Sequence, residues 1–162
     1  MSTVIGVFES QRQAENAVNQ IRNAGITEDK ISIAAKRDNI ENANQADQEA
    51  GDITQQNLSD GTATGGVIGG VAGILGGAGA LAIPGVGPIL AAGPIAAGLT
   101  GAVTGGIAGG LIDMGIPEDR GQHYEQQIKQ GKILTAVETD QNNINEIADQ
   151  LRQSGAKDIE SH

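Results

Sequence analysis

The chain has 162 residues, enough for one domain with a sizeable core or for a small domain with an appendage. Acidic residues outnumber basic ones by 20 to 10, and the formal net charge of -10 disfavours nucleic acid as a partner. The absence of cysteine excludes a disulfide framework, a thiolate metal site and a thiol nucleophile. Residues 1–15 lack a basic region followed by an apolar run, so we expect no signal peptide and a cytoplasmic location.

Residues 1–36 are expected to form a strand, a helix and a second strand. Residues 3–9 alternate apolar and small side chains, which is typical of a strand. Residues 11–24 carry four apolar residues at helical spacing, and Gly25 is expected to end this helix; the four are Ala14, Ala17, Val18 and Ile21. The second strand is expected at residues 30–35, where isoleucines alternate with smaller residues.

The next part of the chain changes from polar to apolar and glycine-rich. Residues 37–60 are acidic and rich in Asn and Gln, and we interpret them as a solvated linker. Residues 61–112 contain no charged residue and hold most of the 25 glycines of the chain. Two sets of these glycines recur at every fourth position: Gly65, Gly69, Gly73 and Gly77, then Gly101, Gly105 and Gly109. Residues at this spacing lie on one face of a helix, where missing side chains let two helix backbones approach closely.

We therefore expect an α-helical hairpin, a glycine zipper, over residues 61–113, with helices at residues 63–82 and 94–112. Pro and Gly residues between the two helices break the first, and Pro94 suits the first position of the second. The tip of the hairpin, residues 83–93, has no polar side chain. A water-exposed loop is normally polar, so we expect this tip to be buried.

Three kinds of partner could bury this hairpin. A bilayer suits the absence of charge, although Asp60 and Asp113 flank the segment and no aromatic or basic residues anchor it. A homo-oligomer could instead pack its hairpins into a dry core in solution. The hairpin could also fold onto the rest of its own chain. Membrane association is the reading we favour, at the cytoplasmic face of a bilayer or inserted in it.

Residues 114–131 are expected to form an amphipathic connecting helix. Pro117 suits the start of a helix, and acidic residues follow it. Tyr124 and Ile128, four positions apart, would lie on one face, and Gly131 would end the helix. We expect this helix to dock on the sheet domain.

Residues 132–162 repeat the pattern of the first 36 residues. A strand is expected at 132–138, a helix at 143–153 and a short strand at 158–160. Two strand-helix-strand halves, each with its helix on the same sheet face, predict an α+β fold with a ferredoxin-like βαββαβ sheet domain. In this interpretation residues 1–36 and 132–162 form the domain, and residues 37–131 interrupt it between its second and third strands.

The split halves, the glycine-rich middle and the stretch IPEDRGQHYEQQIKQGKILTAVET together resemble the bacterial heat-induced general stress proteins of the YflT type. The similarity is strongest over residues 1–36 and 115–160. Its most specific element is the pattern formed by Pro117, Tyr124 and the residues from Gly131 to Leu134. The resemblance implies a role in general stress, and it supplies no catalytic residues.

The sequence offers little support for catalysis, a metal or a cofactor. No phosphate-binding glycine motif occurs, and no lysine lies between Lys36 and Lys129. His123 and His162 are the only histidines, one on a polar helix and one at the terminus. They supply too few ligands for a metal site, and neither is placed by the sequence beside a nucleophile as its general base. We expect neither cofactor nor metal.

The function predicted from the sequence is that of a non-enzymatic stress-associated protein. It is expected to homo-oligomerise through the glycine-zipper residues named above, with itself and a lipid bilayer as partners. One alternative is a soluble self-assembling structural protein whose hairpins form the core. Another is a ferredoxin-like module that binds a small ligand on its sheet face.

Overall fold

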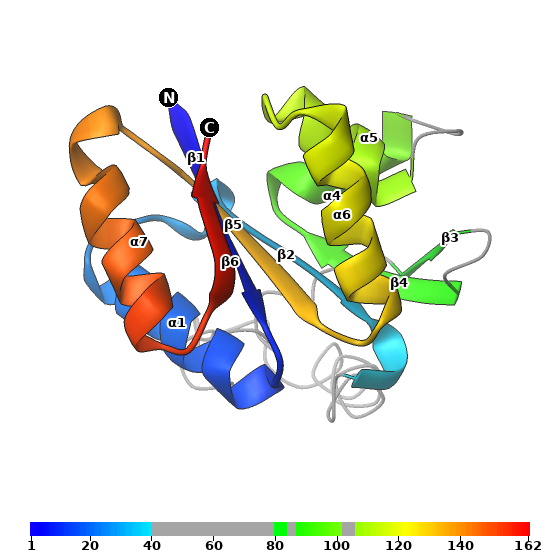
Figure 1. Ribbon diagram of the computed structural model, residues 1–162, viewed down its shortest axis with the longest axis horizontal. Helices are drawn as coiled ribbons and strands as arrows, with labels where there is room; N and C mark the ends of the chain where they lie inside the picture. The colour runs from blue at the N-terminus through cyan, green and yellow to red at the C-terminus, as the bar shows by residue number, and fades with distance from the viewer. Residues whose placement is uncertain (40–79, 84–86, 102–105) are drawn as a thin grey trace, which may run out of the picture.

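The computed structural model describes residues 1–39, 80–83, 87–101 and 106–162 (Figure 1). The repeat halves form the elements that the sequence predicts: β1 (Ser2–Phe8), α1 (Gln11–Asn23), β2 (Ile31–Lys36), β5 (Ile133–Thr139), α7 (Ile144–Gln153) and β6 (Lys157–Ser161). Between them lie β3 (Ala80–Ile83), β4 (Gly87–Ala92), α4 (Pro94–Gly101), α5 (Gly106–Asp113) and α6 (Glu118–Lys129). Short 3-10 turns occupy Glu28–Lys30, Arg37–Asn39 and Gln141–Asn143.

The strands form one antiparallel sheet, so the predicted α+β class is correct. Its order is β3-β4-β2-β5-β1-β6. The first strands of the two halves are neighbours, with Ser2 opposite Thr139 at one end and Phe8 opposite Ile133 at the other. The halves therefore interleave instead of forming two separate units.

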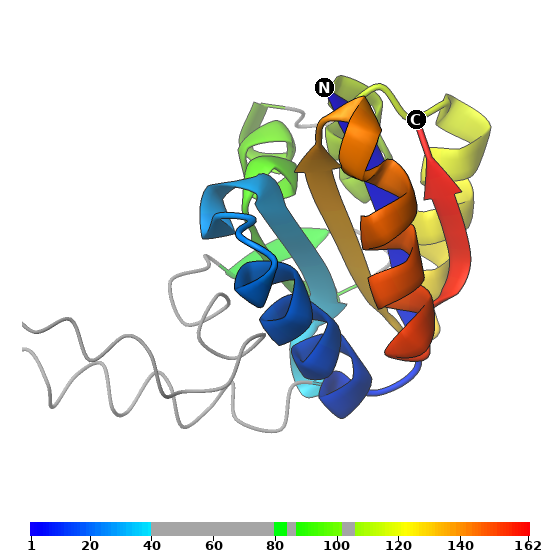
Figure 2. The ribbon, with the colours of Figure 1, turned by 90° about the vertical axis from the view of Figure 1, so that its left-hand side faces the viewer.

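Helices α1 and α7 lie side by side on one face of the sheet (Figure 2). Helix α1 begins after Ser10, whose Oγ accepts a hydrogen bond from the backbone N–H of Gln13, and the chain turns at Gly25 with φ of 92°. The four apolar residues that predicted this helix are all fully buried. They pack on side chains from alternate strand positions, such as Val4, Phe8 and Ile33.

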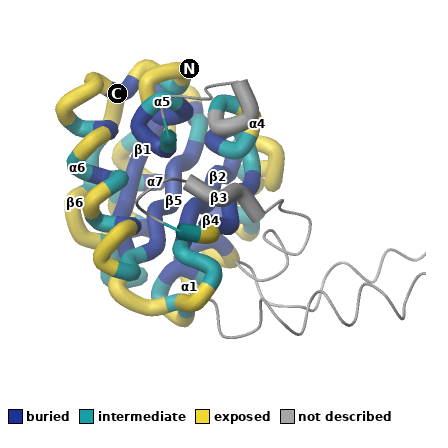
Figure 3. The backbone as a smooth tube through the Cα atoms, turned by 90° about the vertical axis from the view of Figure 1, so that its right-hand side faces the viewer, coloured by how far each residue is buried: buried dark blue, intermediate teal, exposed yellow. Residues whose placement is uncertain are grey.

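Helices α4, α5 and α6 cover the opposite face of the sheet (Figure 1). The intervening strand positions point to this side, so Ile5, Val7 and Leu134 pack with Ile107 and Tyr124. The central strands are consequently buried on both faces, as the tube in Figure 3 shows. The expectation that this sheet face is free to bind a small ligand is wrong, because the inserted helices occupy it.

The predicted tip of the helical hairpin is a β-strand. Residues 87–92 form β4, which pairs antiparallel with β2 from Ile33 opposite Ala92 to Lys36 opposite Ile89. Residues 80–83, expected at the end of the first helix, form β3 and pair with β4. Within the predicted tip, residues 89–92 are buried, and they are buried in the sheet of their own chain, whereas Pro88 is exposed. The rest of the first predicted helix lies outside the described residues.

The second predicted helix, residues 94–112, is divided into α4 and α5. Gly106, the first residue of α5, has a φ of 55°, a left-handed conformation that an uninterrupted α-helix does not contain. The two short helices pack against each other and on the sheet. Within the part of the chain that the structure describes, no helix is both long and apolar enough to cross a membrane.

Candidate functional site: the glycine-packed helix layer and its polar edge

The predicted site consists of seven glycines, most of which fall outside the described residues. These are Gly65, Gly69, Gly73, Gly77 and Gly105. Gly101 is the last residue of α4, and Gly109 is half-buried on α5. Only Gly101 and Gly109 of the seven therefore lie among the residues that the structure describes.

Other glycines make close contacts between helices: Gly98 and Gly110 of the glycine-rich segment, and Gly121 beyond it. A Cβ atom added to Gly98 on α4 would lie 2.7 Å from the Cα of Gly110 on α5. A Cβ atom added to Gly121 on α6 would lie 3.2 Å from the carbonyl oxygen of Ala108 and 3.3 Å from its Cα. Helix α5 is thus packed closely against both α4 and α6. The partners belong to one chain, whereas the sequence alone left the partner open.

The start of this helix layer is fixed to β2. Ser32 is fully buried, and its Oγ accepts a hydrogen bond of 3.2 Å from the backbone N–H of Ile95. Gly93, between β4 and α4, has a φ of 79° and passes so close to β2 that an added Cβ would lie 2.2 Å from the carbonyl oxygen of Ile31. Fully buried Ile95, Ile107 and Leu111 then hold the layer on the sheet.

A cluster of polar side chains joins α6 to the edge strand β6. The guanidinium of Arg120 donates two hydrogen bonds to the carboxylate of Glu160. One runs from Nε to Oε2 at 2.8 Å, and the other runs from Nη2 to Oε1. The same guanidinium lies 5.4 Å from the ring centroid of Tyr124. The Tyr124 hydroxyl donates to the carbonyl oxygen of Asp158 at 3.4 Å. These contacts tie the helix layer to the last strand of the sheet.

This environment shifts the pKa values of Tyr124 and Glu160. Burial raises the pKa of Tyr124 to about 12 and outweighs the opposing effect of Arg120. Burial alone would raise the pKa of Glu160, but hydrogen bonds from Arg120, Tyr124 and His162 hold it below the ordinary value. Glu160 is therefore held as an anion, and the phenol of Tyr124 as a neutral group.

Both histidines lie at this edge. Nε2 of His123 is 3.5 Å from Oδ2 of Asp158, and Nε2 of His162 is 3.3 Å from Oε2 of Glu160. The sequence placed His123 on a polar helix and gave no sign of these pairs, because they depend on the meeting of α6 with β6. Among the described residues, no group of three or more His, Cys, Asp or Glu side chains is placed to hold a metal ion.

Comparison with known proteins gives one family match. Residues 3–81 match the family model described as the heat induced stress protein YflT domain. No curated protein and no solved structure matches the chain. The matched range includes β1, α1 and β2, the first of the two regions that carried the resemblance, whereas the pattern from Pro117 to Leu134 lies beyond it.

Proposed function

We propose that this chain, whose residues 3–81 match the family model of the heat induced stress protein YflT domain, is a non-enzymatic stress-associated protein that binds further copies of itself through residues 61–79. We also propose that the two repeat halves form a ferredoxin-like domain. The order β2-β5-β1-β6, with α1 and α7 on one face, supports this interpretation. In this view β4 and β3 extend the domain at the free edge of β2.

The observation that supports self-association is the position of the second glycine-rich arm. Its side chains Ile95, Ile107 and Leu111 are fully buried in the packing on the sheet, whereas Ile112 is 44% exposed. Its glycine contact, between Gly98 and Gly110, is made within the arm itself. The second arm, which the sequence suggested as one packing partner of the first, is therefore already packed on the sheet of its own chain.

The first arm, residues 61–79, has the same four-residue glycine spacing in its sequence. Each glycine inside a helix costs about 1 kcal/mol relative to alanine, so a helix over residues 65–77 requires close packing to be stable. A second copy offers the same small residues, and pairing of like segments is the simplest symmetric solution. A bilayer is the other environment in which such segments pair, and we propose that the assembly lies at the cytoplasmic face of a membrane or in it.

Light scattering coupled to size exclusion tests the proposal on the intact chain. We expect Gly69→Leu and Gly73→Leu to reduce the particle mass toward that of one chain, because leucine separates the paired backbones. Ala78→Leu adds similar volume on the opposite face of the predicted helix from the glycines at every fourth position, and it serves as the matched control. Unchanged mass in the glycine variants, or equal loss in the control, contradicts the zipper.

Sedimentation with and without lipid vesicles assigns the environment of the assembly. Recovery of the intact chain with vesicles, and loss of that recovery in Gly73→Leu, supports association with a bilayer. A discrete particle that stays in the supernatant with vesicles present supports a soluble assembly. A monomer in both conditions contradicts self-association.

A further inference from the structure

Two neighbouring strands carry a lysine at the same end of the sheet. Lys36 is the last residue of β2, and Lys132 comes directly before β5. Ala34 lies opposite Leu134 where these antiparallel strands pair, and each lysine is two positions beyond that pair in the same direction. Like charges on adjacent strands repel one another, so this arrangement favours an anion beside them.

A third cation lies at this end, in the first turn of α1. Arg12 is exposed, and it borders a cavity of about 450 Å³ whose lining also includes Gly131, the residue before Lys132. Within the described parts of the chain, none of Arg12, Lys36 and Lys132 forms an ion pair. We call these three residues the basic end.

The two acidic side chains that line the cavity do not neutralise the basic end. Glu9 already pairs with a further base, Lys157, at 2.8 Å. The hydrogen bond from Lys157, followed by the charges of Lys157 and Lys132, holds the pKa of Glu9 below its ordinary value. Asp38 is the other acid, and the three bases outnumber it. The basic end is therefore locally positive in a chain whose formal net charge is -10.

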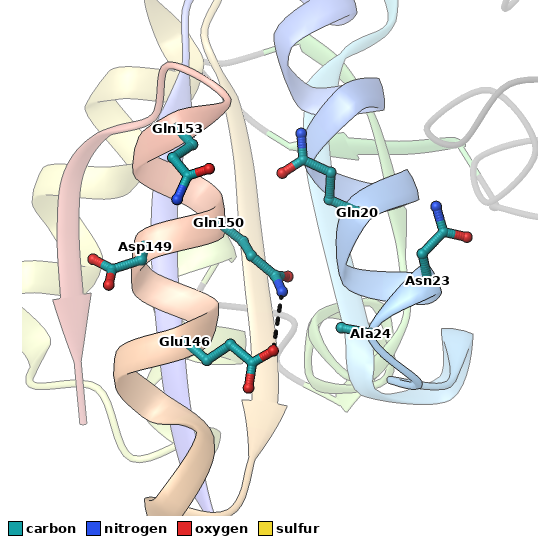
Figure 4. Close-up of a pocket in the computed structure, with 7 residues that line it drawn as sticks. All are labelled: Gln20, Asn23, Ala24, Glu146, Asp149, Gln150 and Gln153. Carbon is teal, nitrogen blue, oxygen red and sulfur yellow. Dashed lines mark hydrogen bonds between the residues drawn. The ribbon is translucent and has the colours of Figure 1, made fainter.

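Other parts of the described surface have the opposite character. The groove between α1 and α7 is lined by amide and carboxylate side chains without a base among them (Figure 4). Its carboxylates come from Glu146 and Asp149 on α7. At the opposite end of the strands, Asp29 lies shortly before β2 and Asp140 directly after β5. The fold thus separates positive from negative charge along the strand direction.

The basic end is also the place at which the chain leaves the sheet for residues 40–79. Asn39 is the last described residue before them, and its Nδ2 donates to the carbonyl oxygen of Gly131 at 2.9 Å. This hydrogen bond fixes the exit beside Lys132. The sequence places no basic residues next to the glycine-rich segment, but the fold brings Lys132 and Arg12 to the exit from distant positions.

We propose that the basic end binds the anionic headgroups of a lipid bilayer. This inference rests on the proposed membrane association of residues 61–79, and it adds the charge of the lipid and the end of the domain that faces it. Segments rich in Gly and Ala enter a bilayer only weakly, and stable anchoring takes a second signal such as a basic patch. Lys and Arg close to an anionic leaflet supply that signal, while the acidic groove between α1 and α7 stays in water.

Sedimentation of the intact chain with two kinds of vesicle tests the proposal. One kind is phosphatidylcholine alone, and the other is phosphatidylcholine mixed with phosphatidylglycerol in equal parts. We expect tighter binding to the mixed vesicles, with a difference that shrinks as salt is added. Lys36→Gln and Lys132→Gln should each weaken binding to the mixed vesicles about fivefold, which is the contribution of one base near an anionic surface. Lys30→Gln removes the same charge just before β2, at its other end, and as the matched control it should leave the affinity unchanged.

Equal affinity for the two kinds of vesicle, or no binding to either, overturns the proposal. Equal weakening by Lys30→Gln also overturns it, because the effect then follows the net charge. Displacement from the mixed vesicles by inorganic phosphate at constant ionic strength assigns the basic end to a soluble anion. A lower particle mass of Lys132→Gln in the absence of lipid assigns it to a second copy of the chain. Either result rejects the lipid.

Gly73→Leu separates this inference from the proposed function. Binding to the mixed vesicles that survives Gly73→Leu but is weakened by Lys36→Gln supports the basic end and contradicts the role of the glycine segment. Binding to both kinds of vesicle that Gly73→Leu abolishes and Lys36→Gln leaves unchanged supports the glycine segment and overturns the basic end.

Discussion

Replacement of Gly93 by alanine should be among the most destabilising single-methyl changes in this protein. The residue sits between β4 and α4 with a φ of 79°, and an added Cβ would lie 2.2 Å from the carbonyl oxygen of Ile31. An L-residue in the left-handed region costs about 1–2 kcal/mol. Displacing packed backbone to relieve such an overlap costs about 1–3 kcal/mol more. The expected loss of unfolding free energy is therefore about 2–5 kcal/mol.

Gly25→Ala is the matched control for this prediction. Gly25 has a φ of 92°, and an added Cβ there would meet no atom within 4 Å. It therefore shares the backbone strain and the loss of unfolded-state entropy with Gly93→Ala, but not the collision with β2. Denaturant unfolding followed by circular dichroism gives both free energies. If the two variants lose equal unfolding free energy, Gly93 does not pass as close to the backbone of β2 as the structure shows.

Three further predictions concern the helix layer and its edge. Gly98→Ala should lower the unfolding free energy despite the better helix propensity of alanine, because the added methyl would lie 2.7 Å from the opposing glycine backbone; a gain in stability contradicts the contact. Absorbance at high pH should show Tyr124, the only tyrosine, ionising near pH 12 in the folded protein and near its ordinary pKa of 10.0 in denaturant. The stability that the buried phenol contributes is therefore lost as the pH rises between these values. A single midpoint shared by the folded and unfolded protein refutes the burial of Tyr124. Because folding lowers the pKa of Glu160, this residue stabilises the fold above its ordinary pKa of 4.5, and the stabilisation is lost as the pH falls through the lower value. Glu160→Gln should therefore lose less unfolding free energy than the unaltered protein when the pH is lowered. Parallel curves of unfolding free energy against pH for the two proteins contradict the pairing with Arg120.

The repeat halves were predictable because their signals are local. Ala14, Ala17, Val18 and Ile21 recur at helical spacing, and all four are buried on the sheet. The helix after Pro117 was predictable for the same reason, and its Tyr124 and Ile128 are fully buried. In each case one helix face meets one apolar surface, and the period of the sequence specifies that face.

The strand at residues 87–92 was not predictable from local pattern. A short apolar run bounded by glycine and proline is equally consistent with a strand, a buried turn or the end of a helix. The choice is made by the free edge of β2, where Ile33 pairs with Ala92 across a long separation in sequence. Gly87 and Pro88 begin β4, and nothing near them in the sequence indicates which edge of the sheet the chain joins.

The glycine pattern predicted close helix packing but not which glycines pack or with what. Gly98 and Gly110 meet within one chain, and neither belongs to the set chosen for its regular spacing. Periodicity describes a face of a single helix, and the break at Gly106 divides that face between two helices. The polar edge at Arg120 and Glu160 was hidden for a related reason, since its members are 40 positions apart.

Hydrogen exchange of the intact chain without lipid tests most directly whether the glycine-rich insertion folds on its own sheet. The account predicts that the amides of β4 are protected to an extent comparable with those of β2, and that α5 shares this protection, because all belong to one packed unit. Rapid exchange of residues 87–92 and 106–113 in solution, with protection gained only when vesicles are added, would contradict it.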